Sequence, residues 1–338
     1  MSKVLVIGPD YYNFLLAVED AFRKCGCECI SLGYDNPVNP YTPFKKAVYK
    51  CSPAPCRRKM IRRSRADFNA RAAELFNSEK PDLVFLMNGD IMEPATLDLF
   101  RSRARVSLWL FDNISKMPSS IETAAHCDHL YSFDKGDVAS LVEAGLKAEF
   151  LPQACDTELY YITGTLKDID ILFVGDLYYY PNRQMLLKKV VRAFRGSRIL
   201  VIGKYKPWYK NPFKWLFRER RDIYTNDGIL PEMVNFYCNR AKVVLNIHRE
   251  DQKNGANPRV FEICGSGAYQ VCDRNPYLSS IFTDGEVGLY DDAEEMISLI
   301  EDALSHDMSD RAKAAHDLTM ADHTYECRMR KVLADAGL

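Results

Sequence analysis

Residues 3–34 read KVLVIGPDYYNFLLAVEDAFRKCGCECISLGY, and this stretch decides the fold. The run KVLVIG (3–8) has the continuous apolar pattern of a strand that is buried on both faces. A turn follows, then apolar residues at helical spacing over 13–25, and CECISLGY (27–34) has the pattern of a second strand. This order predicts a strand, a helix and a parallel strand, the opening unit of an α/β sheet.

The same alternation continues through the first half of the chain. Three further apolar runs are separated by helical or loop lengths: DLVFLMNG (82–89), VSLWLF (106–111) and HLYSF (129–133). Together with the opening unit they predict one doubly wound parallel sheet, in a first domain over residues 1–156.

A second series of buried strands begins after residue 165. Its members are DILFVG (170–175), RILVIG (198–203), KVVLNIH (242–248), AYQVCD (268–273) and EVGLY (286–290). We therefore predict an α/β protein with two Rossmann-like doubly wound domains facing a cleft, the second over residues 166–313. Residues 314–338 are helical in pattern and have no strand of their own, so we expect them to pack back on the first domain as a helix.

Composition excludes several classes of protein. The chain has 338 residues, 27% of them charged, and a formal net charge of −1, so no overall excess of charge indicates a nucleic-acid-binding protein. No window approaches 18 uninterrupted apolar residues, and the first residues lack the pattern of a signal peptide. GxGxxG and GxxxxGK[ST] motifs are also missing. We expect a cytoplasmic protein.

Two segments of the chain are strongly basic, whereas the rest of the sequence is acidic. Residues 44–71 hold ten Lys or Arg against one Asp, and residues 204–221 hold seven against one Glu. The second segment interleaves its cations with aromatic residues, a composition that suits peripheral contact with an anionic membrane, here its inner face. The alternative is a solvated loop and helix with ordinary packing aromatics.

Polar residues follow the predicted strands of the first domain. Asp10, Asn88, Asp90 and Asp112 lie at or just past carboxyl ends, where open α/β sheets bind ligands. We expect them to line a ligand-binding site, with Asp112 the best placed to act as a general base. Helix capping is the alternative role for each of these aspartates.

The most informative stretch for chemistry is LNIHREDQKNGANPRVFEICGSGAYQVCD, residues 245–273. A strand ends near His248, a polar loop with a glycine follows, and a helix is predicted to open at Pro258. Free N–H groups at that helix end suit a pyrophosphate; Arg259 can add a charge-assisted bond, and Glu262 can accept from sugar hydroxyls. The alternative is an ion pair between Arg259 and Glu262.

This stretch resembles a known family. NPRVFEICGSGAYQVCD is similar to the N-x-R-x-F-E-x-x-x-x-G signature of the CgeB-like glycosyltransferases, a group with the GT-B fold. LWLFDN, FLPQACDTELY, DILFVGD, VLNIH and HTYECR occur in the order expected for that group. The resemblance implies that the second domain binds a nucleotide sugar and that the first receives the acceptor.

The resemblance also implies roles for single residues. Glu262 matches the second glutamate of the family's E-x7-E element, which binds the donor ribose, whereas the first glutamate is replaced by Asn254. Asn257 and Arg259 match the family's Asn and Arg, and Arg183 is placed like the basic residue that meets the pyrophosphate. The predicted donor-binding residues are Gly175, Arg183, His248, Asn254, Gly255, Asn257, Arg259 and Glu262.

These observations predict a glycosyltransferase that moves a sugar from a nucleoside diphosphate to a glycan, a lipid-linked or another anionic acceptor. The resemblance favours retention of configuration and catalysis without an essential metal or other cofactor; Arg183 and Arg259 are expected to stabilise the leaving diphosphate. Nucleic acid is a further, less favoured partner. Two alternatives are a nucleotide-sugar epimerase or hydrolase of the same fold and a nucleotide-sugar-binding protein without catalysis, the second suggested by Asn254.

Overall fold

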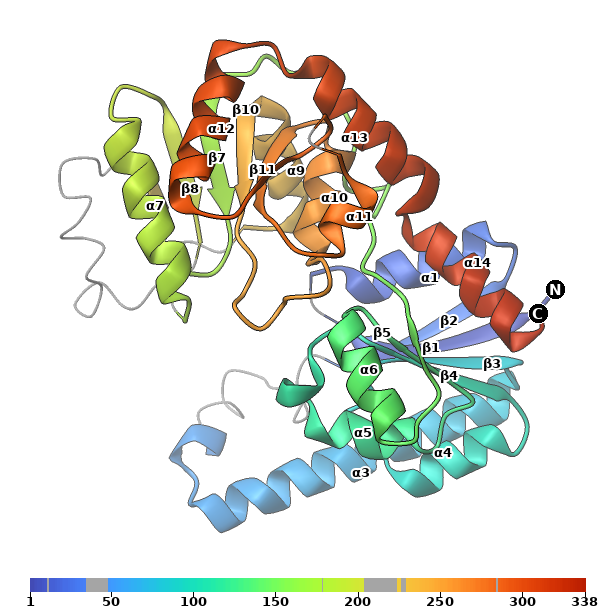
Figure 1. The fold of residues 1–338 in the computed structure, drawn as a ribbon. Helices are drawn as coiled ribbons and strands as arrows, with labels where there is room; N and C mark the ends of the chain where they lie inside the picture. The colour runs from blue at the N-terminus through green and yellow to red at the C-terminus, as the bar shows by residue number, and fades with distance from the viewer. Residues whose placement is uncertain (11, 35–47, 178, 204–223, 226–228, 284) are drawn as a thin grey trace. The chain divides into compact units, whose positions relative to one another are not determined.

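A computed structural model of the chain describes residues 1–10, 12–34, 48–177, 179–203, 224–225, 229–283 and 285–338. Its internal contacts divide it into two units (Figure 1). Unit 1 consists of Met1–Pro152 and Tyr325–Leu338, and unit 2 is the continuous segment Gln153–Thr324. The chain therefore leaves unit 1 once and returns to it once.

Unit 1 is built on a six-stranded sheet in the order β2-β1-β3-β4-β5-β6. Every neighbouring pair of these strands is parallel. The strands are β1 (Lys3–Pro9), β2 (Glu28–Tyr34), β3 (Leu83–Met87), β4 (Arg105–Leu110), β5 (His129–Ser132) and β6 (Ala148–Phe150). The right-handed crossovers that parallel strands require place helices on both faces.

Alternate residues of the central strands point to the two faces of this sheet. Val84 and Leu86 belong to a core beneath the helices that follow β2 and β3, whereas Phe85 lies on the other face against Phe22 and Trp109. Burial on both faces explains why the strands read as continuous apolar runs. The helices of unit 1 are α1 (Phe14–Lys24), α3 (Ala54–Glu79), α4 (Pro94–Arg101), η1 (Ile114–Lys116), α5 (Pro118–Ala124), α6 (Lys135–Glu143) and α14 (Tyr325–Ala336).

The C-terminal helix α14 completes unit 1. It packs beside α1 and β4, and the Tyr325 ring meets the Trp109 ring edge to face (Figure 1). Arg328 Nε donates to the Pro152 carbonyl at 2.9 Å, and the Tyr131 hydroxyl donates to Asp335 at 2.7 Å. The return of the terminal helix to the first domain, predicted from the sequence, is confirmed; the helix before it, α13 (Ser309–Asp322), stays with unit 2.

Unit 2 repeats the architecture with a six-stranded sheet in the order β12-β11-β10-β7-β8-β9. Its neighbouring strands are likewise parallel. The strands are β7 (Ile169–Val174), β8 (Ile199–Ile202), β9 (Tyr224–Thr225), β10 (Ala241–Asn246), β11 (Tyr269–Asp273) and β12 (Gly288–Tyr290). The helices besides α13 are α7 (Pro181–Ala193), α9 (Pro231–Arg240), α10 (Pro258–Gly265), α11 (Leu278–Ile281) and α12 (Ala293–Ser305).

The structure confirms the predicted fold class, since both halves are doubly wound α/β units with parallel sheets. Two short edge strands, β6 and β9, were not predicted from the sequence. In the described part of the chain, no helix has both the length and the apolar character needed to span a membrane. The basic segment 204–221 lies outside the described residues, so its predicted membrane contact stays a prediction.

Candidate functional site

The carboxyl edge of the unit 2 sheet holds a cavity, and among the described residues His248 is the one predicted donor residue that lines it. This cavity of about 490 Å³ opens at the ends of β10, β11 and β12 and beside the first turns of α7 and α12. His248 and Asp273 line it together with cationic residues of the loop after β10, Arg249 and Lys253. This edge is where parallel α/β sheets bind their ligands.

Helix α10 starts at this edge because its first residues suit a helix terminus. Asn257 caps it by accepting the Val260 N–H on its side-chain oxygen at 3.2 Å, and Pro258 occupies the first helical position. The Asn257 amide also exchanges two hydrogen bonds of 3.1 Å with the buried Asn246 at the end of β10. Two positions at this helix end therefore offer no free N–H group to a pyrophosphate, because Pro258 has none and that of Val260 is already bonded; the binding of a pyrophosphate here stays a prediction.

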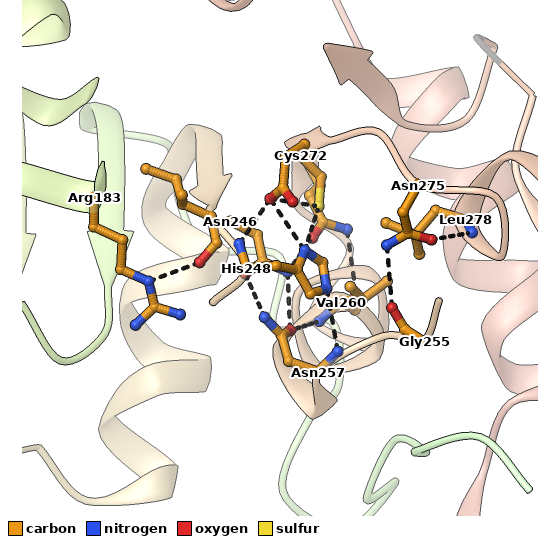
Figure 2. A network of polar contacts seen from close by, with 12 residues as sticks. Arg183, Asn246, His248, Gly255, Asn257, Val260, Cys272, Asn275 and Leu278 are labelled. Atoms are coloured by element: carbon orange, nitrogen blue, oxygen red, sulfur yellow. Dashed lines mark hydrogen bonds and ion pairs between the residues drawn. The ribbon is translucent and has the colours of Figure 1, made fainter. Parts of the chain in front are cut away.

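His248 is held in one tautomer by its neighbours (Figure 2). Its ring Nε2 accepts the backbone N–H of Asn257 at 3.2 Å, so the proton must reside on Nδ1, which donates to Asp273 Oδ1 at 3.0 Å. The same carboxylate oxygen accepts the backbone N–H of His248 at 2.7 Å. Asp273 thus ties the end of β11 to the loop after β10, and through His248 to the start of α10.

His248, Cys272 and Asp273 bring three potential metal ligands within 4.8 Å of one another. A metal on Nδ1 of His248 would leave its proton on Nε2, directed at the N–H of Asn257, so two donors would face each other. Burial also raises the pKa of the Cys272 thiol well above its usual value, which disfavours the thiolate that a metal needs. The hydrogen bonds account for this cluster without an ion; the expectation of a metal-independent site stays a prediction.

Arg183 lies in the first turn of α7, with its guanidinium against the ends of β7 and β10. Its Nε donates to the Ile247 carbonyl at 2.8 Å (Figure 2). Its Nη1 donates to the Asp176 carbonyl at 2.9 Å, and the guanidinium stacks over the Tyr180 ring. An added Cβ at Gly175 would lie 3.6 Å from Nη1, an ordinary contact distance, so Arg183 does not require a glycine there. Burial lowers the pKa of Arg183, and in the described part of the chain no carboxylate forms an ion pair with it.

Arg259 and Glu262 pair with each other on one face of α10. Arg259 Nη1 lies 2.6 Å from Glu262 Oε2, and the two side chains are only 25% and 10% exposed. Burial raises the pKa of Glu262, which the neighbouring Arg259 and a hydrogen bond from Tyr160 oppose in part. The structure thus contains the ion pair between Arg259 and Glu262 that was the alternative to ligand binding. The two side chains are more buried than those of an ordinary surface ion pair. Neither residue lines the cavity.

The remaining donor candidates lie in the loop between β10 and α10. The Gly255 carbonyl accepts from the side chain of Asn275 at 3.1 Å, and Asn275 in turn accepts the N–H of Leu278 (Figure 2). Asn254, which replaces the family glutamate, precedes Gly255 in this loop and is half-buried. Asn275 and Asp273 were not singled out from the sequence, although Asp273 ends an apolar strand just as the predicted acceptor residues do.

The acceptor-side candidates of unit 1 differ in how far their side chains are engaged. Asn88 is buried, has a left-handed φ of 64°, and accepts the Phe111 N–H at 2.8 Å, so its role is structural. Asp90 accepts the Tyr34 hydroxyl at 2.7 Å. Asp10 is exposed after β1, and Asp112 is half-buried after β4. Both lie at the carboxyl edge of the sheet, as predicted.

Comparisons with known proteins agree with this architecture. A family model described as "Glycosyl transferase-like" matches residues 183–334. Spore protein CgeB of Bacillus subtilis is 25% identical over 224 residues, which is 61% of this chain and 69% of that protein. The chain is thus similar to CgeB-like proteins and to glycosyltransferases, and these matches support the predicted resemblance. The matched region includes Arg183, Arg259 and Glu262.

Solved structures confirm the predicted GT-B fold. HepE of Anabaena in complex with UDP-glucose has a TM-score of 0.64 at 10% identity, over 100% of both chains. Sucrose-phosphate synthase of Thermosynechococcus elongatus has a TM-score of 0.64 at 11% identity, over 99% of this chain and 100% of that one. The chain therefore shares their fold across both of its units.

Proposed function

We propose that the protein transfers a sugar from a nucleoside-diphosphate donor, bound at the carboxyl edge of unit 2, to an acceptor bound by unit 1. The acceptor is a glycan, a lipid-linked glycan or another anionic molecule. The nucleotide complexes of HepE, a protein of the same fold, support a donor of this class.

Arg183 is the observation that carries the proposal. Its guanidinium is partly buried at the carboxyl edge of β7 and β10, its two hydrogen bonds go to backbone carbonyls, and no carboxylate of the described residues forms an ion pair with it. A partly buried cation in this position favours an anionic ligand. A diphosphate supplies that charge, and the leaving group gains negative charge as the glycosidic bond breaks. Arg183 thus stabilises the transition state more than the ground state.

Glu262 and His248 have positioning roles in this proposal. Glu262 accepts from the donor ribose hydroxyls while Arg259 keeps it ionised, and the hydrogen bonds of His248 and Asp273 hold the loop that carries Asn254. The Arg259–Glu262 pair neutralises most of the charge of Arg259, so the main contact with the diphosphate falls to Arg183. No step in this reaction requires a metal, and retention of configuration is the proposed outcome.

On the acceptor side, Asp112 is the proposed base or hydrogen-bond partner of the acceptor hydroxyl. It follows β4 at the carboxyl edge and is half-buried. Asn88 and Asp90 each already hold a partner within unit 1, whereas Asp10 is an exposed alternative to Asp112.

The proposal is tested by calorimetry with a panel of nucleosides, nucleoside diphosphates and nucleotide sugars, with and without EDTA. Arg183→Ala should weaken binding of the preferred diphosphate by about tenfold or more, the value of a charge-assisted hydrogen bond, and should leave nucleoside binding nearly unchanged. Arg192→Ala is the matched control, because Arg192 is an exposed arginine of the same helix.

Equal losses for nucleoside and diphosphate would contradict the role of Arg183, and no nucleotide binding by folded protein would contradict the function. Consumption of the donor without any acceptor would favour the hydrolase or epimerase alternative. Binding without any turnover across an acceptor panel would favour the binding-protein alternative.

A further inference from the structure

Helix α3 is much longer than the sheet that it covers. It has 26 residues, or about 39 Å, whereas the strands beside it have five to seven residues, or about 17–23 Å. Its only buried residues are Asn69, Ala72 and Phe76, all in its second half. The first turns of α3 extend away from the rest of unit 1 (Figure 1).

The point at which α3 leaves the sheet is fixed by hydrogen bonds. Arg65 Nε donates to the Ile91 carbonyl at 2.9 Å, the Asn69 side chain donates to the same carbonyl at 3.0 Å, and Arg65 also donates to Met92. Ile91 and Met92 follow β3 at its carboxyl end. Because α3 runs antiparallel to the strands, residues 54–64 project past this edge by about 16 Å.

One stripe of α3 changes character where the helix leaves the sheet. Residues at alternating spacings of four and three lie on one helical face, and here they are Arg58, Arg62, Arg65, Asn69, Ala72 and Phe76. The last three are buried against unit 1 and Arg65 is half-buried, but Arg62 and Arg58 are exposed. The face that packs on the sheet therefore continues as two arginines over the ligand-binding edge of unit 1.

The two arginines of this stripe in the projecting segment have no acidic residue beside them on the same stripe. Within the described residues, no hydrogen bond or ion pair engages Arg58 or Arg62, and the cations Arg57, Lys59 and Arg63 surround them. Helices that lie in a membrane surface need an apolar face. Here the cations occupy most of the circumference, and only Met60 and Ile61 interrupt them, so the segment suits a dissolved polyanion better than a bilayer.

We infer that the projecting half of α3 binds phosphate groups of the acceptor, and that the acceptor is a phosphate-bearing chain in solution. This inference rests on the proposed function, because it takes unit 1 as the acceptor-binding unit. Arginine is suited to the task, since its planar guanidinium forms paired hydrogen bonds with phosphate oxygens. Arg58 and Arg62 lie one turn apart and can hold the chain while an acceptor hydroxyl reaches Asp112 or Asp10.

The test uses the full chain, inorganic polyphosphate as the probe and a matched pair of double variants. Arg58→Gln/Arg62→Gln removes two charges from the stripe, and Lys59→Gln/Arg63→Gln removes two from another face of the same turns. The stripe variant should weaken polyphosphate binding by about tenfold or more at fixed salt, and the control variant by much less. The salt dependence between about 50 and 200 mM should also fall more for the stripe variant.

Equal effects of the two double variants, or none, would overturn the inference, because diffuse attraction or another basic segment would then account for binding. If the stripe variant loses more affinity for phosphatidylglycerol vesicles than for polyphosphate, the inference is overturned in favour of a membrane surface. Binding of nucleoside diphosphates is measured in parallel. If it is normal in the stripe variant, the result bears on α3 alone; if it is missing from the unmodified protein, the proposed function itself fails.

Discussion

At the scale of single residues, the donor edge of unit 2 is organised by neutral hydrogen bonds around a few charges. The side-chain amide of Asn246 is hydrogen-bonded to those of Asn257 and Gln270 near the start of α10. His248 extends this network to Asp273. Such buried networks fix one arrangement of the backbone, because any unpaired member is costly. Arg183 differs, since its hydrogen bonds go to backbone carbonyls and no carboxylate of the described residues forms an ion pair with it.

Asp273 should contribute to stability through His248. Asp273→Ala leaves two N–H donors of His248 without their acceptor and should lower the free energy of unfolding by about 1–2 kcal/mol at neutral pH. The control is Asp291→Ala, which removes a carboxylate that is 68% exposed. Hydrogen exchange of peptides from β10 and β11 during a urea titration measures both.

The effect of Asp273→Ala should depend on pH. Burial would raise the pKa of Asp273, but the hydrogen bonds that it accepts from the Nδ1–H and the backbone N–H of His248 hold it below its usual value. The folded state therefore prefers the ionised carboxylate, whose contribution is complete above the unfolded pKa of about 3.9 and is lost as the pH falls through the lower folded value. The difference between the two proteins should shrink near about pH 3; an equal difference at both pH values would contradict the argument.

At the scale of elements, the strand ends of β7 and β8 are packed too closely for side chains. The Gly175 N–H donates to the Ile202 carbonyl at 2.9 Å, and a Cβ on Gly203 would lie 2.0 Å from the Gly175 carbonyl oxygen. The absence of a side chain at Gly203 allows the two backbones to meet, and Arg183 donates to the Asp176 carbonyl directly after Gly175.

Gly203→Ala should therefore shift β8 against β7 and disturb Arg183. We expect a loss of about 1–3 kcal/mol in stability, the range for overpacking, together with weaker binding of nucleoside diphosphates. Gly196→Ala is the control, because an added Cβ at Gly196 meets nothing within 4 Å. Melting temperature and diphosphate affinity report on both variants, and an unchanged affinity in Gly203→Ala would contradict the proposed link between this contact and Arg183.

The longer strands were predictable from the sequence because each is buried on both faces and reads as an apolar run. The edge strand β6 was missed: it has only three residues, none of them buried, so it leaves no pattern. The position of polar residues at strand ends was also predictable. Their partners were not, since His248 and Asp273 meet only through the register of β10 and β11, in which Asn246 pairs with Cys272. The engagement of Asn88 with Phe111 likewise depends on neighbouring strands.

At the scale of the whole molecule, each unit has its own core, and a helix from a distant part of the sequence completes unit 1. Met329 of α14 and Met296 of α12 are both fully buried, one in each unit. Truncation of a buried methionine to alanine leaves a cavity and costs about 2–5 kcal/mol.

Met329→Ala should lower hydrogen-exchange protection in unit 1, including β4 and α1, and leave unit 2 nearly unchanged. Met296→Ala should do the reverse, so each variant is the control for the other. Hydrogen exchange resolved by peptide is the measurement, because two units need not unfold in one transition. Loss of protection across both units in either variant would show that they unfold as one.

The topology also sets an order on folding during synthesis. Domains usually form in the order in which the ribosome makes them. Here α14 is translated after the whole of unit 2, yet it covers α1 and β4 and holds Pro152 through Arg328. The first unit to be translated is therefore the last to be finished. Until α14 has been translated, Trp109 lacks its contact with the Tyr325 ring, and the part of the unit 1 sheet that α14 covers stays exposed. The time for which this apolar surface is exposed depends on how soon α14 is made and packs.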